Sequence, residues 1–217
     1  MYQEWAQLIL ANCHKFGTTL EIGATNPITS EVFAQIDVIG LDVAGIGKVA
    51  VRADATELPV RTSSLANIIA IDTFHLIQDA HRFLEEVTRT LKPGGRLILI
   101  EPWISRWSTL MFRMFHHEPL DTHTDWYLFG SDPMARANIA LPWIVFSRDA
   151  KQLSKKFPIL KVKSLEKLMP ISLLLSGGSK SRLGAPMFLY KKVRLVEHIL
   201  ELRGVGMQAL IVVEKHL

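Results

Sequence analysis

The segment from Leu91 to Pro102 constrains the fold of this chain more than any other stretch, and it reads LKPGGRLILIEP. Proline cannot continue a helix, and glycine adopts the positive φ that a helix exit often needs, so Pro93-Gly94-Gly95 predicts the end of a helix. Leu97–Ile100 then forms an unbroken apolar run. Such a run is typical of a strand covered on both faces of a parallel sheet.

Similar apolar runs recur upstream and are separated by helix-length stretches: Thr19–Ile22, Val38–Leu41 and Ile68–Ile71. Further strands are predicted at Lys48–Asp54, near Ile159–Val162 and at Ala209–Glu214. Helices are predicted at Tyr2–Phe16, Ala80–Leu91, Ser105–Phe115 and Val193–Leu202. This alternation indicates a doubly wound, Rossmann-like α/β fold with three layers in the order α/β/α.

The composition is sufficient for one domain with a well-buried core. The chain has 217 residues, of which 48% are hydrophobic, and we expect a single domain spanning residues 1–217. No apolar run approaches the roughly 20 residues of a membrane-spanning helix, and the N-terminal sequence lacks the pattern of a secretory signal. The lone cysteine, Cys13, excludes an internal disulfide framework and predicts a cytoplasmic protein with a buried thiol.

Charge is distributed unevenly along the chain. Residues 1–102 hold 8 Lys/Arg against 12 Asp/Glu, whereas residues 103–217 hold 17 against 9. The basic second half fits either a solvated surface or a contact with something anionic, such as a phosphorylated substrate or a membrane surface. Nucleic acid is disfavoured as a partner, because the basic residues are scattered and no nucleic-acid module is recognisable.

Acidic residues end several of the predicted strands. Asp42, Asp54 and Asp72 each follow an apolar run, and Glu21 and Glu101 lie at the ends of two others. In an open parallel sheet, ligands bind in the crevice outside the carboxyl ends of the strands. A single such acid is more often a turn cap, but the repetition predicts a binding site at this edge.

Four motifs occur in a fixed order: Leu20-Glu21-Ile22-Gly23, Leu41-Asp42, Ala53–Pro59 and Leu91–Leu97. Together they resemble the class I S-adenosylmethionine-dependent methyltransferases, in particular the subgroup of small-molecule and ubiquinone-biosynthesis-like enzymes. The resemblance covers roughly residues 18–102. It implies a seven-stranded mixed sheet whose last strand is antiparallel, and S-adenosyl-L-methionine as the cofactor.

The resemblance implies that the turn containing Glu21, Gly23 and Ala24 lies under the methionine part of the cofactor. The family turn is usually glycine-rich, whereas this chain keeps only its first glycine and continues with Thr25 and Pro27. Glycine lets the backbone approach a ligand closely and adopt positive φ. The degenerate turn therefore keeps open a second interpretation, a catalytically inactive binding or interaction protein on the same fold.

Other cofactor contacts are also implied by the resemblance. Asp42 would accept hydrogen bonds from the ribose hydroxyls, and Asp54 would accept one from the adenine amino group, with the Ala55 backbone beside the ring. Asp72 and His75 would line the floor near the transferable methyl group. A nicotinamide enzyme is disfavoured, because the first turn lacks the pattern Gly-x-Gly-x-x-Gly.

Residues 103–150 are predicted to be an insertion that forms a substrate lid, since long insertions of this kind are usually functional. Trp103 and Trp107 are its candidate substrate contacts, although packing against the core is the simpler role for these residues. The loop 176–184 contains Lys180 and Arg182 and is either a surface connection or an anion-binding flap.

Three histidines are candidates for the general base, because imidazole titrates near neutrality. His117 is the first choice, His116 the second and His75 the third. Alternatively, His116 and His117 only cap the end of the preceding helix. We expect no metal, since the spacing of His116, His117, Glu118 and His123 does not match a metal motif.

The sequence therefore predicts a cytoplasmic S-adenosylmethionine-dependent methyltransferase. Its acceptor would be a small or lipid-linked molecule, with O-methylation favoured over attack by nitrogen or carbon, and the basic second half favours an anionic one. The basic, aromatic second half also admits peripheral contact with a membrane. The oligomeric state stays open.

Overall fold

The structure, a computed structural model, describes residues 1–24, 36–44, 49–130, 132–175, 187–202 and 205–217. Its centre is a seven-stranded sheet in the order β3-β2-β1-β4-β5-β7-β6. The strands are β1 (Thr19–Ile22), β2 (Val38–Asp42), β3 (Val51–Arg52), β4 (Leu65–Ile71), β5 (Leu91–Pro102), β6 (Leu160–Leu168) and β7 (Gln208–Lys215). Strands β1 to β5 are parallel, and β7 is antiparallel to both β5 and β6. The predicted mixed sheet with an antiparallel last strand is confirmed.

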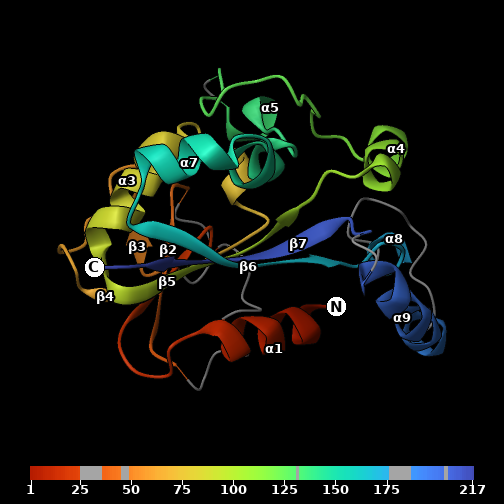
Figure 1. Ribbon diagram of the computed structural model, residues 1–217, viewed down its shortest axis with the longest axis horizontal. Coiled ribbons are helices and arrows are strands. Elements are labelled where there is room, and N and C mark those ends of the chain that lie inside the picture. The colour runs from red at the N-terminus through yellow and green to blue at the C-terminus, as the bar shows by residue number, and fades with distance from the viewer. Residues whose placement is uncertain (25–35, 45–48, 131, 176–186, 203–204) are drawn as a thin grey trace.

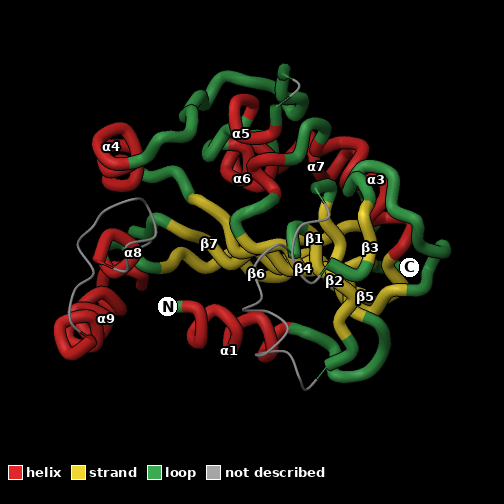
Figure 2. Tube along the Cα trace, turned by 180° about the vertical axis from the view of Figure 1, so that it is seen from behind, coloured by secondary structure: helices red, strands yellow, loops and turns green. Residues whose placement is uncertain are grey.

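Helices cover both faces of this sheet (Figure 1). They are α1 (Tyr2–Asn12), α3 (Ala80–Thr90), α4 (Arg106–Phe115), α5 (Pro133–Arg136), α6 (Leu141–Trp143), α7 (Ala150–Lys156), α8 (Ser172–Leu175) and α9 (Met187–Leu202), with the short helical turns η1 (Phe74–Leu76) and η2 (Ile144–Arg148). Helices α3 and α7 lie on one face and α1 on the other, while α4, α8 and α9 gather at one end of the sheet (Figures 1 and 2). The three-layer architecture is as predicted.

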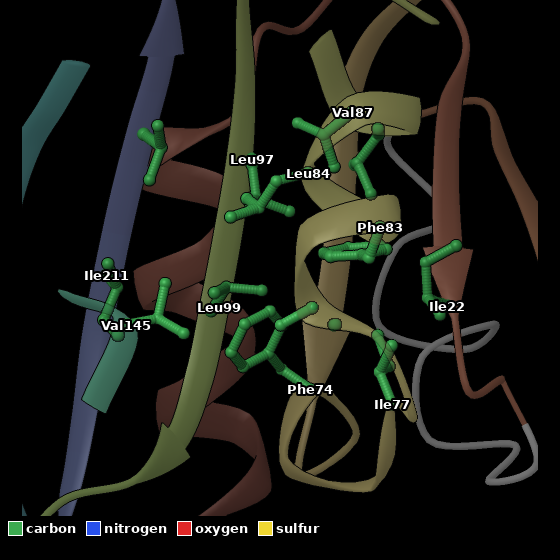
Figure 3. Packing of buried hydrophobic residues seen from close by; sticks show 14 of the residues in the cluster. Ile22, Phe74, Ile77, Phe83, Leu84, Val87, Leu97, Leu99, Val145 and Ile211 are labelled. Carbon is green, nitrogen blue, oxygen red and sulfur yellow. The ribbon is translucent and has the colours of Figure 1, made fainter. Parts of the chain in front are cut away.

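Two hydrophobic cores result, one on each face of the sheet. On the α3 face, the Phe74 ring packs against Phe83 of α3 and Phe146 of η2, with ring centroids 5.7 and 5.6 Å apart. Figure 3 shows Phe74 beside Leu99 of β5 in this core. On the other face, Trp5 and Ile9 of α1 pack with residues of β4, β5 and β7. The central strands are buried on both faces, which explains their unbroken apolar runs.

Helix α3 forms where the sequence predicts it. The side chain of Asp79 caps its first turn by accepting a hydrogen bond from the Arg82 N–H at 3.0 Å. Phe83, Leu84 and Val87 point into the core from one face of the helix. The chain then enters β5 directly, and Gly94 has a φ of +76° in the predicted turn.

Helix α1 is shorter than predicted and ends at Asn12 instead of Phe16. The Asn67 side chain of β4 accepts a hydrogen bond from the His14 N–H at 2.9 Å and donates one to the His14 carbonyl at 3.0 Å. These hydrogen bonds fix the backbone at His14 in a non-helical conformation. As a result, Phe16 lies outside the helix and is 90% exposed. Cys13 is buried as predicted, and burial raises the pKa of its thiol to about 12.

Three further boundaries differ from the sequence predictions. Strand β3 contains only Val51–Arg52, because it pairs with β2 alone at the edge of the sheet. Strand β6 is longer than predicted, because it pairs with β7 along its length. Helix α9 is also longer and begins at Met187. The predicted insertion 103–150 contains the buried segment Ala137–Phe146, which belongs to the core. The lid role of this insertion stays a prediction.

The turn after β1 lies at the point where the strand order reverses, between β2 and β4. The N–H groups of Gly23 and Ala24 both donate to the Leu41 carbonyl, at 2.8 and 3.2 Å. Gly23 has a φ of +75°, and a Cβ there would lie 2.2 Å from Thr73 Oγ1. Glycine is therefore required at this position both by its conformation and by the close approach of the Thr73 side chain, which follows β4. The remaining turn residues, including Thr25 and Pro27, lie outside the described residues.

Among the described helices, none is long and apolar enough to cross a membrane.

Replacing Gly23 with alanine should destabilise the protein by about 3 kcal/mol or more, because a left-handed φ and a steric clash act together. Gly94→Ala is the matched control, since Gly94 has nearly the same φ but a Cβ there would meet nothing within 4 Å. We expect the control to lose only about 1–2 kcal/mol in urea denaturation. Equal losses in the two variants would contradict the described packing of Gly23 on Thr73.

Candidate functional site

The predicted strand-end acids gather at the carboxyl edge of the sheet. Asp42 is the last residue of β2, Asp54 follows β3, and Asp72 directly follows β4. Because β1 pairs with both β2 and β4, these strand ends flank the turn after β1. Glu21 is buried within β1. The sequence prediction that Asp42, Asp54 and Asp72 share one edge is confirmed, whereas Glu21 lies one residue before the end of β1.

The two acids on the β2–β3 side are held by their own turns. Asp42 Oδ1 accepts a hydrogen bond from the Ala44 N–H at 2.7 Å. Asp54 Oδ1 accepts hydrogen bonds from both the N–H and the hydroxyl of Thr56 at 2.8 Å, and the neighbouring Ala55 is buried. A carboxylate has about four acceptor positions, so a turn cap can also accept from a ligand.

On the β4–β5 side, His75 is clamped between two carboxylates. Its Nδ1 lies 2.7 Å from Glu101 Oε2 and its Nε2 lies 3.1 Å from Glu118 Oε2. The His75 and Glu101 side chains are only 4% and 0% exposed. Burial lowers the pKa of His75, but the hydrogen bonds and charges of Glu101 and Glu118 outweigh it and raise the pKa to about 10. His75 is therefore an imidazolium that donates from both ring nitrogens.

Glu101 also organises the chain that carries His75. Its Oε1 accepts hydrogen bonds from the N–H groups of Thr73 and Phe74, both at 2.7 Å. These are amide groups at the start of the short helix η1, where free N–H groups favour a negative charge. A carboxylate at the end of β5 thus fixes the exit of β4.

Asp72 lies beside this clamp in an unusual backbone conformation. Its φ is +46°, its N–H donates to the Ile100 carbonyl at 2.9 Å, and its Oδ1 accepts from Gln208 Nε2 at 3.1 Å. The residue as a whole is exposed, but nearby protein atoms partly desolvate its carboxylate. This desolvation and the nearby charge of Glu101 raise the pKa of Asp72 to about 7. Strained acids with shifted pKa values are concentrated at functional sites.

The two other candidate histidines follow α4. His116 is the residue that caps the C-terminus of α4, and its N–H donates to the Phe112 carbonyl. His116 Nδ1 accepts a hydrogen bond from the Glu118 N–H at 3.2 Å, and burial lowers the pKa of its ring. The rings of His116 and His117 are stacked with centroids 5.1 Å apart. His116 thus takes the C-cap position through its backbone, and His117 is exposed, while the capping role of the two side chains stays a prediction.

A cavity of about 160 Å³ joins these groups. Its polar lining consists of Asp72, His75, His116, His117, Glu118 and Gln208. Its apolar lining includes Trp5 of α1, Leu173 of α8, and Met111, Phe112 and Phe115 of α4. All three candidate histidines and one strand-end acid therefore meet in one cavity beyond β4, β5 and β7.

The predicted substrate contacts lie elsewhere or outside the described residues. Trp103 is buried in the core on the α3 face, and Trp107 donates from Nε1 to the Pro170 carbonyl. Neither side chain lines the cavity. Lys180 and Arg182 lie outside the described residues. Within the described ranges, no three His, Cys, Asp or Glu side chains are arranged to hold a metal ion.

Two cavity residues were not selected as site residues from the sequence. The sequence offers Glu118 only as part of a metal spacing, and the signal that points to it as a site residue is its position beside His116 and His117. Gln208 begins β7 and reaches Asp72 across the antiparallel pairing, a contact between residues 136 positions apart. Nothing in the local sequence around Gln208 indicates that contact.

Comparison with known proteins supports the fold. Residues 20–99, less than half of the chain, match the family model described as a methyltransferase domain. This segment includes β1, β2, β4 and the strand-end acids from Glu21 to Asp72. No curated protein matches the chain.

Solved structures resemble the whole chain. The geranyl diphosphate C-methyltransferase of Streptomyces coelicolor A3(2) is 13% identical, with a TM-score of 0.59 over 99% of this chain and 78% of that one. The YcgJ protein of Bacillus subtilis is 16% identical, with a TM-score of 0.57 over 100% and 99%. A Thermotoga maritima methyltransferase described as a possible histamine N-methyltransferase is 15% identical, with a TM-score of 0.58 over 99% and 89%. At these identities the likeness shows a shared fold.

The clamp around His75 gives a stability prediction. Glu101→Gln should lower the free energy of unfolding by about 3–5 kcal/mol at pH 7, because it leaves a buried imidazolium with one partner fewer. Glu166→Gln is the control, since Glu166 is an exposed residue of β6 and should change stability by less than about 0.5 kcal/mol. A loss of under 1 kcal/mol in Glu101→Gln, measured by urea denaturation, would contradict the buried charged clamp.

The same clamp gives a pH prediction. The pKa of His75 is about 10 in the folded chain, against about 6.5 for a free histidine. Its protonation therefore stabilises the fold fully below pH 6.5, and this contribution is lost as the pH rises toward 10. The stability difference between the wild type and His75→Gln should shrink over that range. A difference that grows with pH would show that His75 is neutral in the folded protein.

Proposed function

We propose that this chain is a class I S-adenosylmethionine-dependent methyltransferase that acts on a small or lipid-linked acceptor, with O-methylation favoured. One observation carries the proposal. Within the segment that matches a methyltransferase domain, the turn after β1 and the acids of β2 and β3 lie at the strand-order reversal, directly beside a separate polar-and-apolar cavity. Ligands of open α/β sheets bind at such a reversal.

The residues at the β1–β3 ends fit S-adenosylmethionine. Asp42 is suited to accept from a ribose diol and Asp54 from an adenine amino group, because both carboxylates are fixed acceptors at the edge. Gly23 keeps the backbone bare where a Cβ would not fit. Solved neighbours of the same fold contain S-adenosyl-L-homocysteine or S-adenosylmethionine. The cofactor, when bound, supplies a methyl group activated by a sulfonium.

The residues of the chain then have to hold the acceptor, exclude water and accept a proton. His117 remains the first proposed base among the three histidines. His75 has both ring nitrogens engaged by carboxylates, and His116 Nδ1 accepts from a backbone N–H. Because their ring nitrogens already take part in these hydrogen bonds, His75 and His116 are better suited to position other groups than to accept a proton.

The surface of α4 supports a lipid-linked acceptor. Met111, Phe112 and Phe115 of this helix line the cavity, while Leu110 and Met114 are 52% and 61% exposed on its outer side. Arg106 and Arg113 are also exposed on α4. An apolar and basic helix surface beside a cavity is suited to an anionic lipid surface. The buried lone cysteine supports a cytoplasmic location.

Calorimetric titration with S-adenosylmethionine and S-adenosylhomocysteine tests this proposal. We expect binding, and Asp42→Asn should weaken it by about 1.5–3 kcal/mol, or roughly 10- to 150-fold, because a charge-assisted hydrogen bond is lost. The control Asp125→Asn changes an exposed aspartate away from the edge and should bind like the wild type. The absence of heat with folded protein would refute the proposal. Binding without any methyl transfer across an acceptor panel would favour the inactive binding protein.

A further inference from the structure

The polar end of the cavity carries an excess of negative charge. Asp72 and Glu118 line it, and Glu101 lies directly behind His75. His75 is the single imidazolium held between Glu101 and Glu118. Burial and Glu101 raise the pKa of Asp72. Burial also raises the pKa of Glu118, but the hydrogen bond from His75 and the charges of His75, His116 and His117 together outweigh it and lower that pKa. A carboxylate or phosphate oxygen is disfavoured there, since like charges repel strongly in a partly dry site.

The polar end of the cavity offers a ligand more hydrogen-bond acceptors than donors. Gln208 Nε2 donates to Asp72 Oδ1, which fixes the orientation of the amide. Gln208 Oε1 then remains buried without a hydrogen-bond partner among the described residues. An orphaned buried acceptor is uncommon and calls for an incoming donor. Asp72 and Gln208, which share a hydrogen bond and both line the cavity, together favour a ligand that carries O–H or N–H groups.

His75 and His116 are not suited to accept this proton. Both ring nitrogens of His75 donate to carboxylates, so it has no free lone pair. His116 Nδ1 already accepts the Glu118 N–H, so the other ring nitrogen carries the proton in the neutral ring. Asp72 follows β4 directly and lies beside the turn after β1, on the side where the proposed cofactor would bind.

We propose, on the basis of the proposed function, that the cavity takes an acceptor whose reacting atom carries its own proton. This atom is the oxygen of a hydroxyl or the nitrogen of an uncharged amine on a small apolar body, and Asp72 accepts its proton. An anionic part of the acceptor, if there is one, binds away from this end.

The chemical step balances with these groups. A lone pair of the hydroxyl oxygen or amine nitrogen forms a bond to the methyl carbon, and the carbon–sulfur bond of the sulfonium donor breaks with its electron pair moving to sulfur. The proton of the acceptor passes to the Asp72 carboxylate. A pKa near 7 suits this exchange, because the carboxylate is then basic enough to take the proton and can release it at neutral pH.

The apolar walls limit what carries the reacting atom. A cavity of about 160 Å³ lined by Trp5, Met111, Phe112 and Leu173 accommodates a group about the size of one aromatic ring or a short branched chain. Benzyl alcohol, benzylamine and benzoate therefore form a matched probe set. They share the ring and differ in the polar group at neutral pH, which is an uncharged hydrogen-bond donor in benzyl alcohol, a cationic donor in benzylamine and an anion in benzoate.

Binding of these three probes is measured by ligand-observed NMR, both with and without saturating S-adenosylhomocysteine. We expect benzyl alcohol and benzylamine to bind at least tenfold more tightly than benzoate. Asp72→Asn should weaken benzylamine binding at least tenfold and remove most of the discrimination against benzoate. Asp125→Asn, which changes an exposed aspartate outside the cavity lining, should bind all three probes like the wild type. Benzoate binding as tightly as benzyl alcohol overturns the proposal.

The pH dependence of benzyl alcohol binding identifies the acceptor group, because the probe itself does not titrate. Affinity should rise as the pH rises through about 7, as Asp72 becomes a carboxylate facing His75, Glu101, Glu118 and the His116–His117 pair. Asp72→Asn should abolish this change. If His117→Gln abolishes it instead, the base is His117 and the proposal fails. If the probes bind but S-adenosylhomocysteine does not, the proposed function is refuted while the assignment of the cavity stays intact.

Discussion

The clamp of Glu101 and Glu118 on His75 is the interaction on which the rest of the site depends. Glu101 ends β5, His75 belongs to the turn after β4, and Glu118 follows α4. One buried imidazolium therefore joins two strand ends and the first part of the segment that follows β5. Breaking a buried charge pair leaves an uncompensated charge, so these three chain segments are expected to hold their relative positions firmly. The relative positions of these segments determine the shape of the cavity beside Asp72.

The clamp also sets the electrostatic character of the cavity. Three carboxylates, Asp72, Glu101 and Glu118, lie around one protonated histidine. Burial and, after it, the charge of Glu101 raise the pKa of Asp72. Asp72 has a φ of +46°, a conformation that is costly for most residues. Strain and an unfavourable charge at one residue reduce stability, and they persist where function requires them. The same features that weaken the fold locally give Asp72 the basicity proposed for it.

Much of the fold follows from the sequence, since apolar runs and strand-end acids are local patterns. The run Leu97–Ile100 predicts the buried β5, and Asp42 predicts the end of β2. Both features depend on residues that are close together in the sequence. Phe16 was assigned to α1 wrongly, because the competing hydrogen bonds come from Asn67 of β4. The clamp and the contact of Gln208 with Asp72 were not foreseen, since they join residues far apart in the chain. Base and cofactor assignments stay predictions.

The protonation state of His75 tests this account most directly. In protein labelled with ¹⁵N at histidine, the two ring nitrogens of an imidazolium have similar chemical shifts, whereas a neutral ring shows two very different ones. The account predicts that His75 stays doubly protonated from pH 6 to pH 9, because Glu101 and Glu118 raise its pKa to about 10. A His75 ring that becomes neutral near pH 6.5, like a free histidine, would contradict the clamp and the negative cavity that depends on it.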